Sequence, residues 1–298
     1  MLKQVEAGVL RVAYREEGDP GGWPVILLHG FPYDVHAYDA VAPRLAEAGA
    51  RVIIPWLRGH GPTRFLSLDT PRSGEQAALG SDLLALMDAL AIPRALVAGY
   101  DWGGRAACVL SALWPERVAG LITGDGYNIQ DIARAREPLP PEREYRYWYQ
   151  HYLHGERGAA GLAAHRQDFC QLLWRLWSPQ WSFGEEAFAR SATAFDNPDF
   201  VDVVVHSYRH RYGLVPGDPS VAEIEQRLAA RPSIGVPAIS LDGGADGVAR
   251  PEGSAGDARH FTGPFEHRTL PGIGHNIPQE APEAFSEAVL ALHRHAGR

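Results

Sequence analysis

The feature that most constrains the fold is an alternation of short apolar runs with longer amphipathic stretches over the first 123 residues. The apolar runs, predicted as strands, comprise residues 9–14, 25–28, 51–54, 95–98 and 118–123. The stretches with helical spacing comprise residues 38–48, 76–90 and 105–113. Short apolar runs between helices are typical of parallel strands that are buried on both faces. We therefore expect an α/β fold with a mostly parallel central sheet flanked by helices.

The alternation of predicted strands and helices stops after residue 127 and resumes near the C-terminus. Residues 128–215 are rich in Tyr, Trp, His and Arg and show no strand pattern. Strands are again predicted at 238–241 and 267–270, followed by a helix at 282–293. We predict a helical lid at 128–215, inserted between two parts of one core, 1–127 and 216–298.

Composition narrows the class of protein. The formal net charge of −8 disfavours a nucleic-acid or anionic-membrane partner. Cys108 and Cys170 are too few for a disulfide framework, and no Cys/His cluster has zinc spacing. The sequence has no signal peptide and no apolar run near the ~18 residues of a spanning helix. We expect a soluble, cytoplasmic protein that acts on a small molecule without a metal or organic cofactor; the sequence leaves its oligomeric state open.

The strongest local motif is a predicted strand, tight turn and helix start at residues 95–104. Gly99, Gly103 and Gly104 surround Asp101 in the pattern of a nucleophile elbow, in which the sharp turn excludes side chains beside the nucleophile. The central position usually holds serine, and here it holds Asp101. The simpler alternative is that Asp101 caps the following helix.

A nucleophile of this kind needs an acid and then a base in chain order. His275 lies on a glycine-rich turn after the last predicted strand and is the candidate base. Asp246 follows the penultimate strand at a distance that lets it reach the same edge of the sheet, whereas Asp242 comes too early. Asp125, just after the strand at 118–123, is a rival acid.

An oxyanion hole requires two backbone N–H donors. The elbow offers one from Trp102, and the loop His29-Gly30-Phe31-Pro32 offers the second from Phe31.

Together these segments resemble the epoxide hydrolase and haloalkane dehalogenase branch of the α/β-hydrolase superfamily. The similar motifs are His29-Gly30-Phe31-Pro32, Arg58-Gly59-His60-Gly61, Gly99-Tyr100-Asp101-Trp102-Gly103-Gly104 and Gly274-His275. The resemblance covers nearly the whole chain and implies an α/β-hydrolase fold with Asp101 as nucleophile.

Within the branch, the resemblance favours epoxide hydrolases, which hold and protonate the epoxide oxygen with two lid tyrosines. The segment Tyr149-Gln150-His151-Tyr152-Leu153 implies Tyr149 as the first, and His206-Ser207-Tyr208-Arg209 implies Tyr208 as the second. Tyr152 and Tyr147 are the alternatives.

The dehalogenases of the branch match less well. Haloalkane dehalogenases bind halide with a Trp after the nucleophile, which Trp102 matches, and with a second Trp or Asn. Phe31 replaces that Asn, so a lid tryptophan (Trp148, Trp174 or Trp177) would have to serve. Fluoroacetate dehalogenases place one Arg directly after the nucleophile and another three residues later. Here Trp102 fills the first place, and Arg105 stands four residues after Asp101. In the fluoroacetate dehalogenases, the acid that pairs with the base stands at the position that Asp125 occupies here.

A carboxylate nucleophile can displace at saturated carbon, which fits a strained ring or a carbon–halogen bond. We therefore predict an epoxide hydrolase that forms a vicinal diol through an alkyl-enzyme ester on Asp101, hydrolysed by a water that His275 activates. A haloalkane or haloacetate dehalogenase with the same nucleophile is the alternative. A non-enzymatic small-molecule receptor on the same fold is a more remote one.

Overall fold

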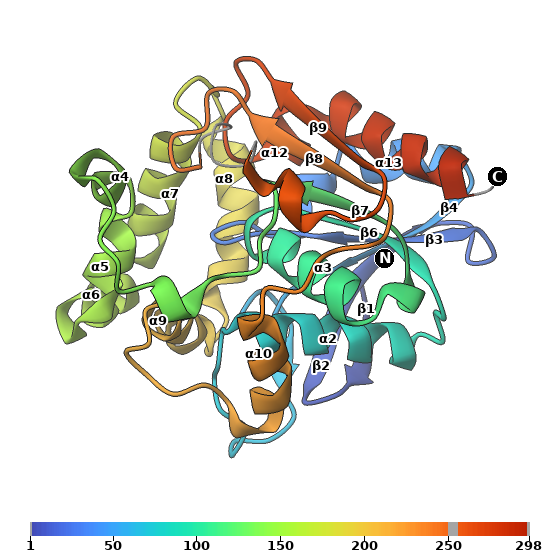
Figure 1. Ribbon diagram of the computed structural model, residues 1–298. Helices are drawn as coiled ribbons and strands as arrows, with labels where there is room; N and C mark the ends of the chain where they lie inside the picture. The colour runs from blue at the N-terminus through green and yellow to red at the C-terminus, as the bar shows by residue number, and fades with distance from the viewer. Residues whose placement is uncertain (1, 250–255, 297–298) are drawn as a thin grey trace.

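The computed structural model describes residues 2–249 and 256–296, and its centre is a nine-stranded sheet (Figure 1). The strand order is β1-β2-β4-β3-β6-β7-β8-β9, and β5 pairs with β2. The strands are β1 Leu2–Ala7, β2 Leu10–Gly18, β3 Trp23–Leu28, β4 Ala50–Pro55, β5 Arg64–Phe65, β6 Ala95–Gly99, β7 Val118–Gly124, β8 Ala238–Gly243 and β9 Phe265–Leu270. All pairings among β3, β4 and β6–β9 are parallel, and those of β1, β2 and β5 are antiparallel. This confirms the predicted α/β-hydrolase architecture.

Helices cover both faces of the sheet, which explains why its central strands read as continuous apolar runs. On one face α2 (Gln76–Ala89) packs on α3 (Asp101–Leu113), and α10 (Ala222–Ala229) packs on α2 (Figure 1). On the other face lie α1 (Ala42–Glu47) and α13 (Pro282–Ala296). Every residue of β6 is buried between these layers. The buried strand therefore gives a rigid base to the turn that follows it.

The segment between β7 and β8 is helical, as its lack of strand rhythm predicts. All of its α-helices before α10 gather on one side of the sheet (Figure 1). They are α4 Pro141–Arg146, α5 Trp148–His154, α6 Glu156–Ala164, α7 Arg166–Trp177, α8 Glu185–Ala192 and α9 Phe200–His210. Short 3-10 turns lie at η3 Ile132–Arg134, η4 Thr193–Asp196 and η5 Pro219–Val221. The predicted lid limits at residues 128 and 215 stay a prediction.

Two element predictions are wrong in detail. The first strand predicted at 9–14 is part of β2, and an additional strand, β1, precedes it across a turn at Gly8, whose φ is +57°. β1 is an exposed edge strand, so burial imposes no apolar pattern on it. The helix predicted at 38–48 is divided into η1 (Val35–Tyr38) and α1, because Pro43 cannot donate a backbone hydrogen bond within a helix and stands in the first turn of α1 instead.

The remaining short elements lie before β7, β9 and α13. They are η2 Pro115–Arg117, η6 Gly256–His260 and α12 Ile277–Glu280. Among the described residues, no helix is both long enough and apolar enough to cross a membrane.

Candidate active site

Asp101 stands on the turn that joins β6 to α3. Its φ of +50° lies in the left-handed region, which costs energy for a residue with a Cβ. Tyr100 takes the N-cap position, so Asp101 is the first helical residue and not the cap. The glycines are a steric requirement: a Cβ on Gly103 would lie 2.0 Å from the carbonyl oxygen of Leu28, and one on Gly99 would lie 2.5 Å from the backbone of Gly103. The sequence therefore folds here into a sharp, strained turn that presents a carboxylate.

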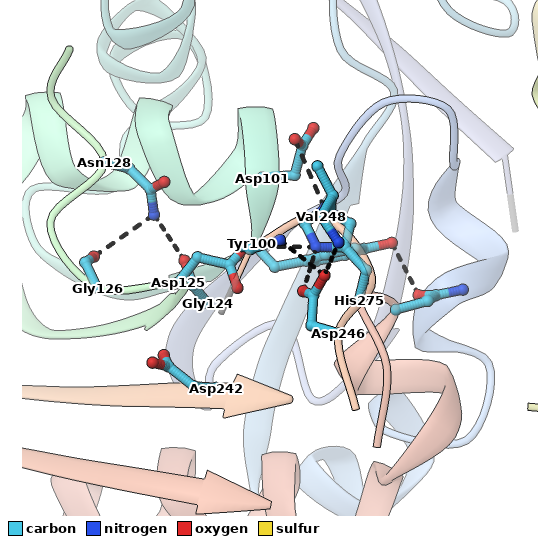
Figure 2. A network of polar contacts seen from close by, with 12 residues as sticks. Tyr100, Asp101, Gly124, Asp125, Gly126, Asn128, Asp242, Asp246, Val248 and His275 are labelled. Atoms are coloured by element: carbon cyan, nitrogen blue, oxygen red, sulfur yellow. Dashed lines mark hydrogen bonds and ion pairs between the residues drawn. The ribbon is translucent and has the colours of Figure 1, made fainter. Parts of the chain in front are cut away.

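His275 joins this carboxylate to a second one (Figure 2). Its Nδ1 lies 2.6 Å from Asp246 Oδ2, and its Nε2 lies 3.7 Å from Asp101 Oδ2. The other oxygen of Asp246 accepts hydrogen bonds from the backbone N–H groups of Val248 and Ala249 at 2.7 and 2.8 Å. Asp246 thus accepts hydrogen bonds on both oxygens, which orients the ring of His275 with Nε2 towards Asp101.

Asp125 reaches the same imidazole. Its Oδ2 lies 3.5 Å from Nδ1 of His275, and its φ is +65°. Burial, opposed by His275 but reinforced by the charge of Asp246, raises the pKa of Asp125 well above its ordinary value. Asp242 lies apart from the cluster in Figure 2 and accepts from His267 at 2.9 Å. The structure therefore brings both Asp246 and Asp125 to His275, with Asp246 at hydrogen-bonding distance.

Charge pairing dominates the electrostatics of the site. Burial alone would lower the pKa of His275, but the carboxylates of Asp246, Asp125 and Asp101 outweigh it and raise that pKa well above the usual value. Burial likewise opposes ionisation of Asp101, yet hydrogen bonding to His275 and the charges of His275 and Arg105 hold its pKa below the ordinary one. At neutral pH the site therefore contains an ionised Asp101 beside an imidazolium.

The loop after β3 supplies a hydrogen-bond donor to Asp101. The backbone N–H of Phe31 donates to Asp101 Oδ1 at 2.7 Å, and a Cβ on Gly30 would come within 2.6 Å of the Cβ of Asp101. His29 fixes this loop: its Nε2 accepts from the backbone N–H of Leu57 at 3.1 Å, so its Nδ1 is the protonated nitrogen that donates to the Gly30 carbonyl at 2.9 Å.

The second predicted donor, Trp102, comes directly after Asp101. In the first turn of α3 its backbone N–H has no acceptor within the helix, so it is free to bind an oxyanion. Two donors that flank one carboxylate are the arrangement an oxyanion hole requires.

Two buried tyrosines of the helical segment lie near enough to Asp101 to feel its charge. Tyr149 on α5 and Tyr208 on α9 have ring centroids 5.3 Å apart, and Tyr208 packs 5.6 Å from Phe31. Burial raises the pKa of both phenols, and the charge of Asp101 adds to the effect. Tyr149 accepts a hydrogen bond from the Gln150 amide at 2.8 Å, which leaves its own proton available. Both hydroxyls are therefore protonated at neutral pH.

The alternative tyrosines lie elsewhere. Tyr152 packs against Trp148 and Phe169, at 6.2 and 6.1 Å between ring centroids, and its hydroxyl lies beside Gly161. Tyr147 precedes α5 as its N-cap residue.

The tryptophans of the halide-binding alternative are divided between the site and the core. Among the described residues, the indole N–H of Trp102 is buried without a well-formed hydrogen bond. The Tyr208 hydroxyl lies close to this N–H, which opposes the rise in the pKa of Tyr208. Trp177 packs 5.1 Å from the ring of His275. Trp174 donates instead to the Pro32 carbonyl at 2.7 Å, and Trp148 packs among aromatic rings of the helical segment.

Sequence reasoning missed the residues that hold the His275 turn. Glu280 accepts from the backbone N–H groups of Gly274 and Asn276 at 2.7 and 3.0 Å and from the Ser178 hydroxyl at 2.6 Å. The Ser178 hydroxyl in turn accepts from the backbone N–H of His275 at 3.1 Å. A Glu shortly after a Gly-His pair is the only local signal. Ser178 comes from the distant helical segment and could not be placed from the sequence.

Tyr33 was also missed. Its ring lies 6.3 Å from that of His275, its hydroxyl is buried without a hydrogen bond among the described residues, and burial raises its pKa well above the usual value. Arg105 and Arg211 were not predicted as site residues either, although four-residue spacing from Asp101 along α3 is a signal for Arg105.

A cluster with ligand-type atoms is formed by Asp125, Asp246 and His275, whose oxygen and nitrogen atoms lie within 4.8 Å of one another. The short contact between His275 Nδ1 and Asp246 identifies them as a hydrogen-bonded pair, so a metal would have to displace that proton.

A separate cavity of about 370 Å³ is lined by the N-cap residue of α2, by residues 130–133 and 217–218, by α10 and by the end of α9. Its acidic wall includes Glu75, whose pKa burial raises to about 7, and Glu225. His210, whose pKa burial lowers to about 4, lies 3.0 Å from Glu75. Asp101 and His275 do not line this cavity.

Comparison with known proteins agrees with this fold. A profile described as "alpha/beta hydrolase fold" matches residues 24–282. Epoxide hydrolase A of Mycobacterium tuberculosis is 26% identical over 96% of this chain and 95% of its own length. A solved structure of a proposed epoxide hydrolase from Klebsiella pneumoniae is 48% identical, covers 98% of this chain and 97% of its own, and superposes with a TM-score of 0.96. A haloalkane dehalogenase from Mycobacterium marinum is 32% identical over 43% of this chain and 42% of its length.

Proposed function

Because the chain belongs to the alpha/beta hydrolase fold family and is a hydrolase related to epoxide hydrolases, we propose that it opens an epoxide to a vicinal diol. The observation that carries this proposal is the position of the Asp101 carboxylate. One of its oxygens accepts from the backbone N–H of Phe31, and the other lies 3.7 Å from the imidazole of His275. The protonated phenols of Tyr149 and Tyr208 face the same carboxylate.

In the first step an oxygen of Asp101 attacks one ring carbon of the epoxide. The carbon–oxygen bond of the ring breaks, and the departing oxygen takes a proton from Tyr149 or Tyr208. The low pKa of Asp101 keeps the nucleophile ionised, while the raised pKa values of the phenols keep their protons in place until negative charge develops nearby.

In the second step a water hydrolyses the ester. Esterification removes the negative charge of Asp101, which is one of the charges that hold a proton on His275. The pKa of His275 consequently falls, so its Nε2 proton can return to the phenolate that the first step left. The neutral Nε2 can then accept a proton from water, while Asp246 stabilises the imidazolium that forms again. The water oxygen attacks the carboxyl carbon of Asp101, and the backbone N–H groups of Phe31 and Trp102 hold the oxyanion. The bond between this carbon and the alkyl oxygen then breaks, and the leaving oxygen takes the proton from His275 to give the diol. In this scheme helices α4–α9 act as the lid that keeps bulk water out.

A dehalogenase is the second candidate, and one observation favours it. The indole N–H of Trp102 is buried beside Asp101 without a well-formed hydrogen bond, so it could hold a departing halide. Trp177, next to His275, is the partner that such a site would use.

The proposal is tested by following diol and halide together on purified protein. The substrates are styrene oxide, 1-bromobutane and fluoroacetate, and Asp101→Asn serves as the control that lacks the nucleophile. We expect diol from the epoxide, and none from the variant. Halide release without any diol would assign the protein to the dehalogenases instead.

A further inference from the structure

The end of helix α7 contacts both of the loops that carry Asp246 and His275. The carbonyl oxygen of Trp177, the last residue of α7, accepts from the backbone N–H of Gly247 at 3.0 Å and from that of His275 at 3.2 Å. Gly247 directly follows Asp246 in the chain. One carbonyl of the helical segment therefore ties the loop of the carboxylate to the turn of the imidazole.

The two loops meet α7 so closely that each has a glycine at the contact. A Cβ on Gly247 would lie 1.9 Å from the Leu176 carbonyl oxygen, and one on Gly274 would lie 2.5 Å from the Cα of Ser178. These neighbours are backbone atoms, which cannot move aside as the end of a flexible side chain can. The end of α7 is therefore fitted tightly against the core, and the turn that begins before His275 has little room to shift.

A second connection runs through side chains. The Ser178 hydroxyl accepts from the backbone N–H of His275 at 3.1 Å and donates to Glu280 at 2.6 Å. Glu280 also accepts from the backbone N–H groups of Gly274 and Asn276, at 2.7 and 3.0 Å. The Ser178 hydroxyl and the Glu280 carboxylate thus supply acceptors to three consecutive backbone N–H groups.

The position of His275 has to be accurate for the ester-hydrolysis step. Its Nδ1 lies 2.6 Å from Asp246, and its Nε2 lies 3.7 Å from Asp101. A general base acts over about 2.6–3.2 Å, and a displacement of about 1 Å can slow a reaction about a hundredfold. Asp246 fixes the rotation of the ring, but the backbone of the turn fixes where the side chain begins. Whatever holds that turn therefore affects how well Nε2 reaches a water at the carboxyl carbon of Asp101.

We propose that Ser178 and Glu280 are positioning residues for hydrolysis of the alkyl-enzyme ester, because they hold the turn of His275 against the end of α7. Replacing either side chain removes an acceptor from a backbone N–H of the turn, so His275 is held less accurately. Ester formation uses the Asp101 carboxylate and a phenol proton, so it should depend little on this turn. The inference rests on the proposed covalent mechanism and adds the residues that set the rate of its second step.

Glu280 differs from Ser178 because it also carries a charge. Burial raises the pKa of Glu280, whereas hydrogen bonds from Ser178 and the backbone and the charge of His275 oppose that rise. Because this interaction is mutual, an ionised Glu280 favours the imidazolium form of His275. The other ionisable groups around the ring of His275 are Asp101, Asp125, Asp246, Tyr33 and Tyr100. Replacing Glu280 should therefore lower the pKa of His275, and replacing Ser178 should not.

The test follows a single turnover of styrene oxide by rapid-quench intact-mass measurement in the wild type, S178A and E280Q. The matched controls are T193A, which removes an exposed hydroxyl that donates to the Arg190 carbonyl, and E283Q, which removes an exposed carboxylate on α13. We expect S178A and E280Q to slow decay of the ester about tenfold. Their ester formation, and both steps in the controls, should change by about twofold or less.

An unchanged rate of ester decay in both variants would overturn the proposal. Equal slowing of ester formation and decay would also overturn it, because the two side chains would then support the site as a whole and not the base. S178A removes a single hydroxyl and carries the test if E280Q does not fold.

Titration of His275 in the free protein needs no turnover and separates the two roles of Glu280. It is followed by NMR with ¹³C-labelled histidine, and H275Q identifies the signal. The pKa of His275 should be lower in E280Q than in the wild type and the same in S178A. An unchanged pKa in E280Q would overturn the electrostatic role of Glu280.

Failure of this proposal is distinguishable from failure of the proposed function. If styrene oxide forms no ester but 1-bromobutane does, the epoxide function falls, and the positioning role is measured on the butyl ester, whose hydrolysis needs the same base. If the epoxide forms an ester that decays at one rate in the wild type and both variants, the function stands and the positioning role falls.

Discussion

Replacing Asp246 by asparagine should slow hydrolysis of the alkyl-enzyme ester about tenfold to a hundredfold, with little effect on ester formation. The substitution removes the charge from the 2.6 Å hydrogen bond between Asp246 and His275. A hydrogen bond to a charged group contributes about 1.5–3 kcal/mol, and each 1.36 kcal/mol changes a rate about tenfold. The loss falls on the second step, because in that step His275 takes a proton from water and Asp246 stabilises the imidazolium that forms.

Asp125 makes this prediction sharper. The raised pKa of Asp125 favours its neutral form, and Asp125 lies farther from Nδ1 of His275 than Asp246 does, so Asp125→Asn should slow turnover less than about threefold. The charge of Asp246 is one cause of the raised pKa of Asp125. Removing that charge lets Asp125 ionise and partly replace the missing acid from 3.5 Å. The double variant should therefore lose about tenfold more than the product of the single effects.

Rapid-quench intact-mass measurement separates the two steps, since the ester adds the mass of the epoxide to the protein. Asp246→Asn should accumulate the ester, and Asp125→Asn should not. A larger effect from Asp125→Asn than from Asp246→Asn would refute the assignment of Asp246 as the principal acid. If the double variant lost only the product of the two single effects, Asp125 would not take over the role of Asp246 when Asp246 is replaced.

The remaining predictions concern the phenols, the elbow and the acidic cavity. Replacing both Tyr149 and Tyr208 by phenylalanine should slow epoxide opening by about 10²–10⁴-fold, and an unchanged diol rate would remove them from the chemistry. Gly103→Ala should destabilise the fold by about 3 kcal/mol or more in denaturant unfolding because its Cβ would meet a β3 carbonyl at 2.0 Å, whereas Gly155→Ala, with open space around it, should differ by less than about 1 kcal/mol. Glu75→Gln should raise Tm by about 4 °C near pH 8 and leave it unchanged near pH 4. Because burial raises the pKa of Glu75 to about 7 in the folded protein, protonated Glu75 favours the fold, and this contribution is lost as the pH rises through that value. A Tm change of the same size at both pH values would show that the ionisation of Glu75 is not the cause.

Local chemistry made much of the fold predictable. The apolar runs at 25–28 and 95–98 read as buried strands because both faces of the sheet are covered, and the glycines around Asp101 indicate a turn that excludes larger residues. β1 could not be predicted, since an exposed edge strand carries no burial pattern. The division of residues 38–48 into η1 and α1 depends on where Pro43 stands in the first turn of α1, which periodicity alone does not locate.

The candidate site was predictable where one segment carries the signal. Asp101, His275 and Phe31 each lie in a short motif of their own, and the structure brings them within hydrogen-bonding or ion-pair range of one another. The relation between Asp246 and Asp125 could not be settled from the sequence, because both follow strands that end at the same edge of the sheet. Only their distances from Nδ1 of His275 distinguish them.

The proposed covalent intermediate is tested most directly by a single turnover in ¹⁸O-labelled water with enzyme in excess over epoxide. If the Asp101 carboxylate attacks the ring, the first diol carries unlabelled oxygen from the protein, and ¹⁸O is then found in the peptide that contains Asp101. A labelled first diol with an unlabelled Asp101 would mean that water attacks the epoxide directly, which would contradict the account.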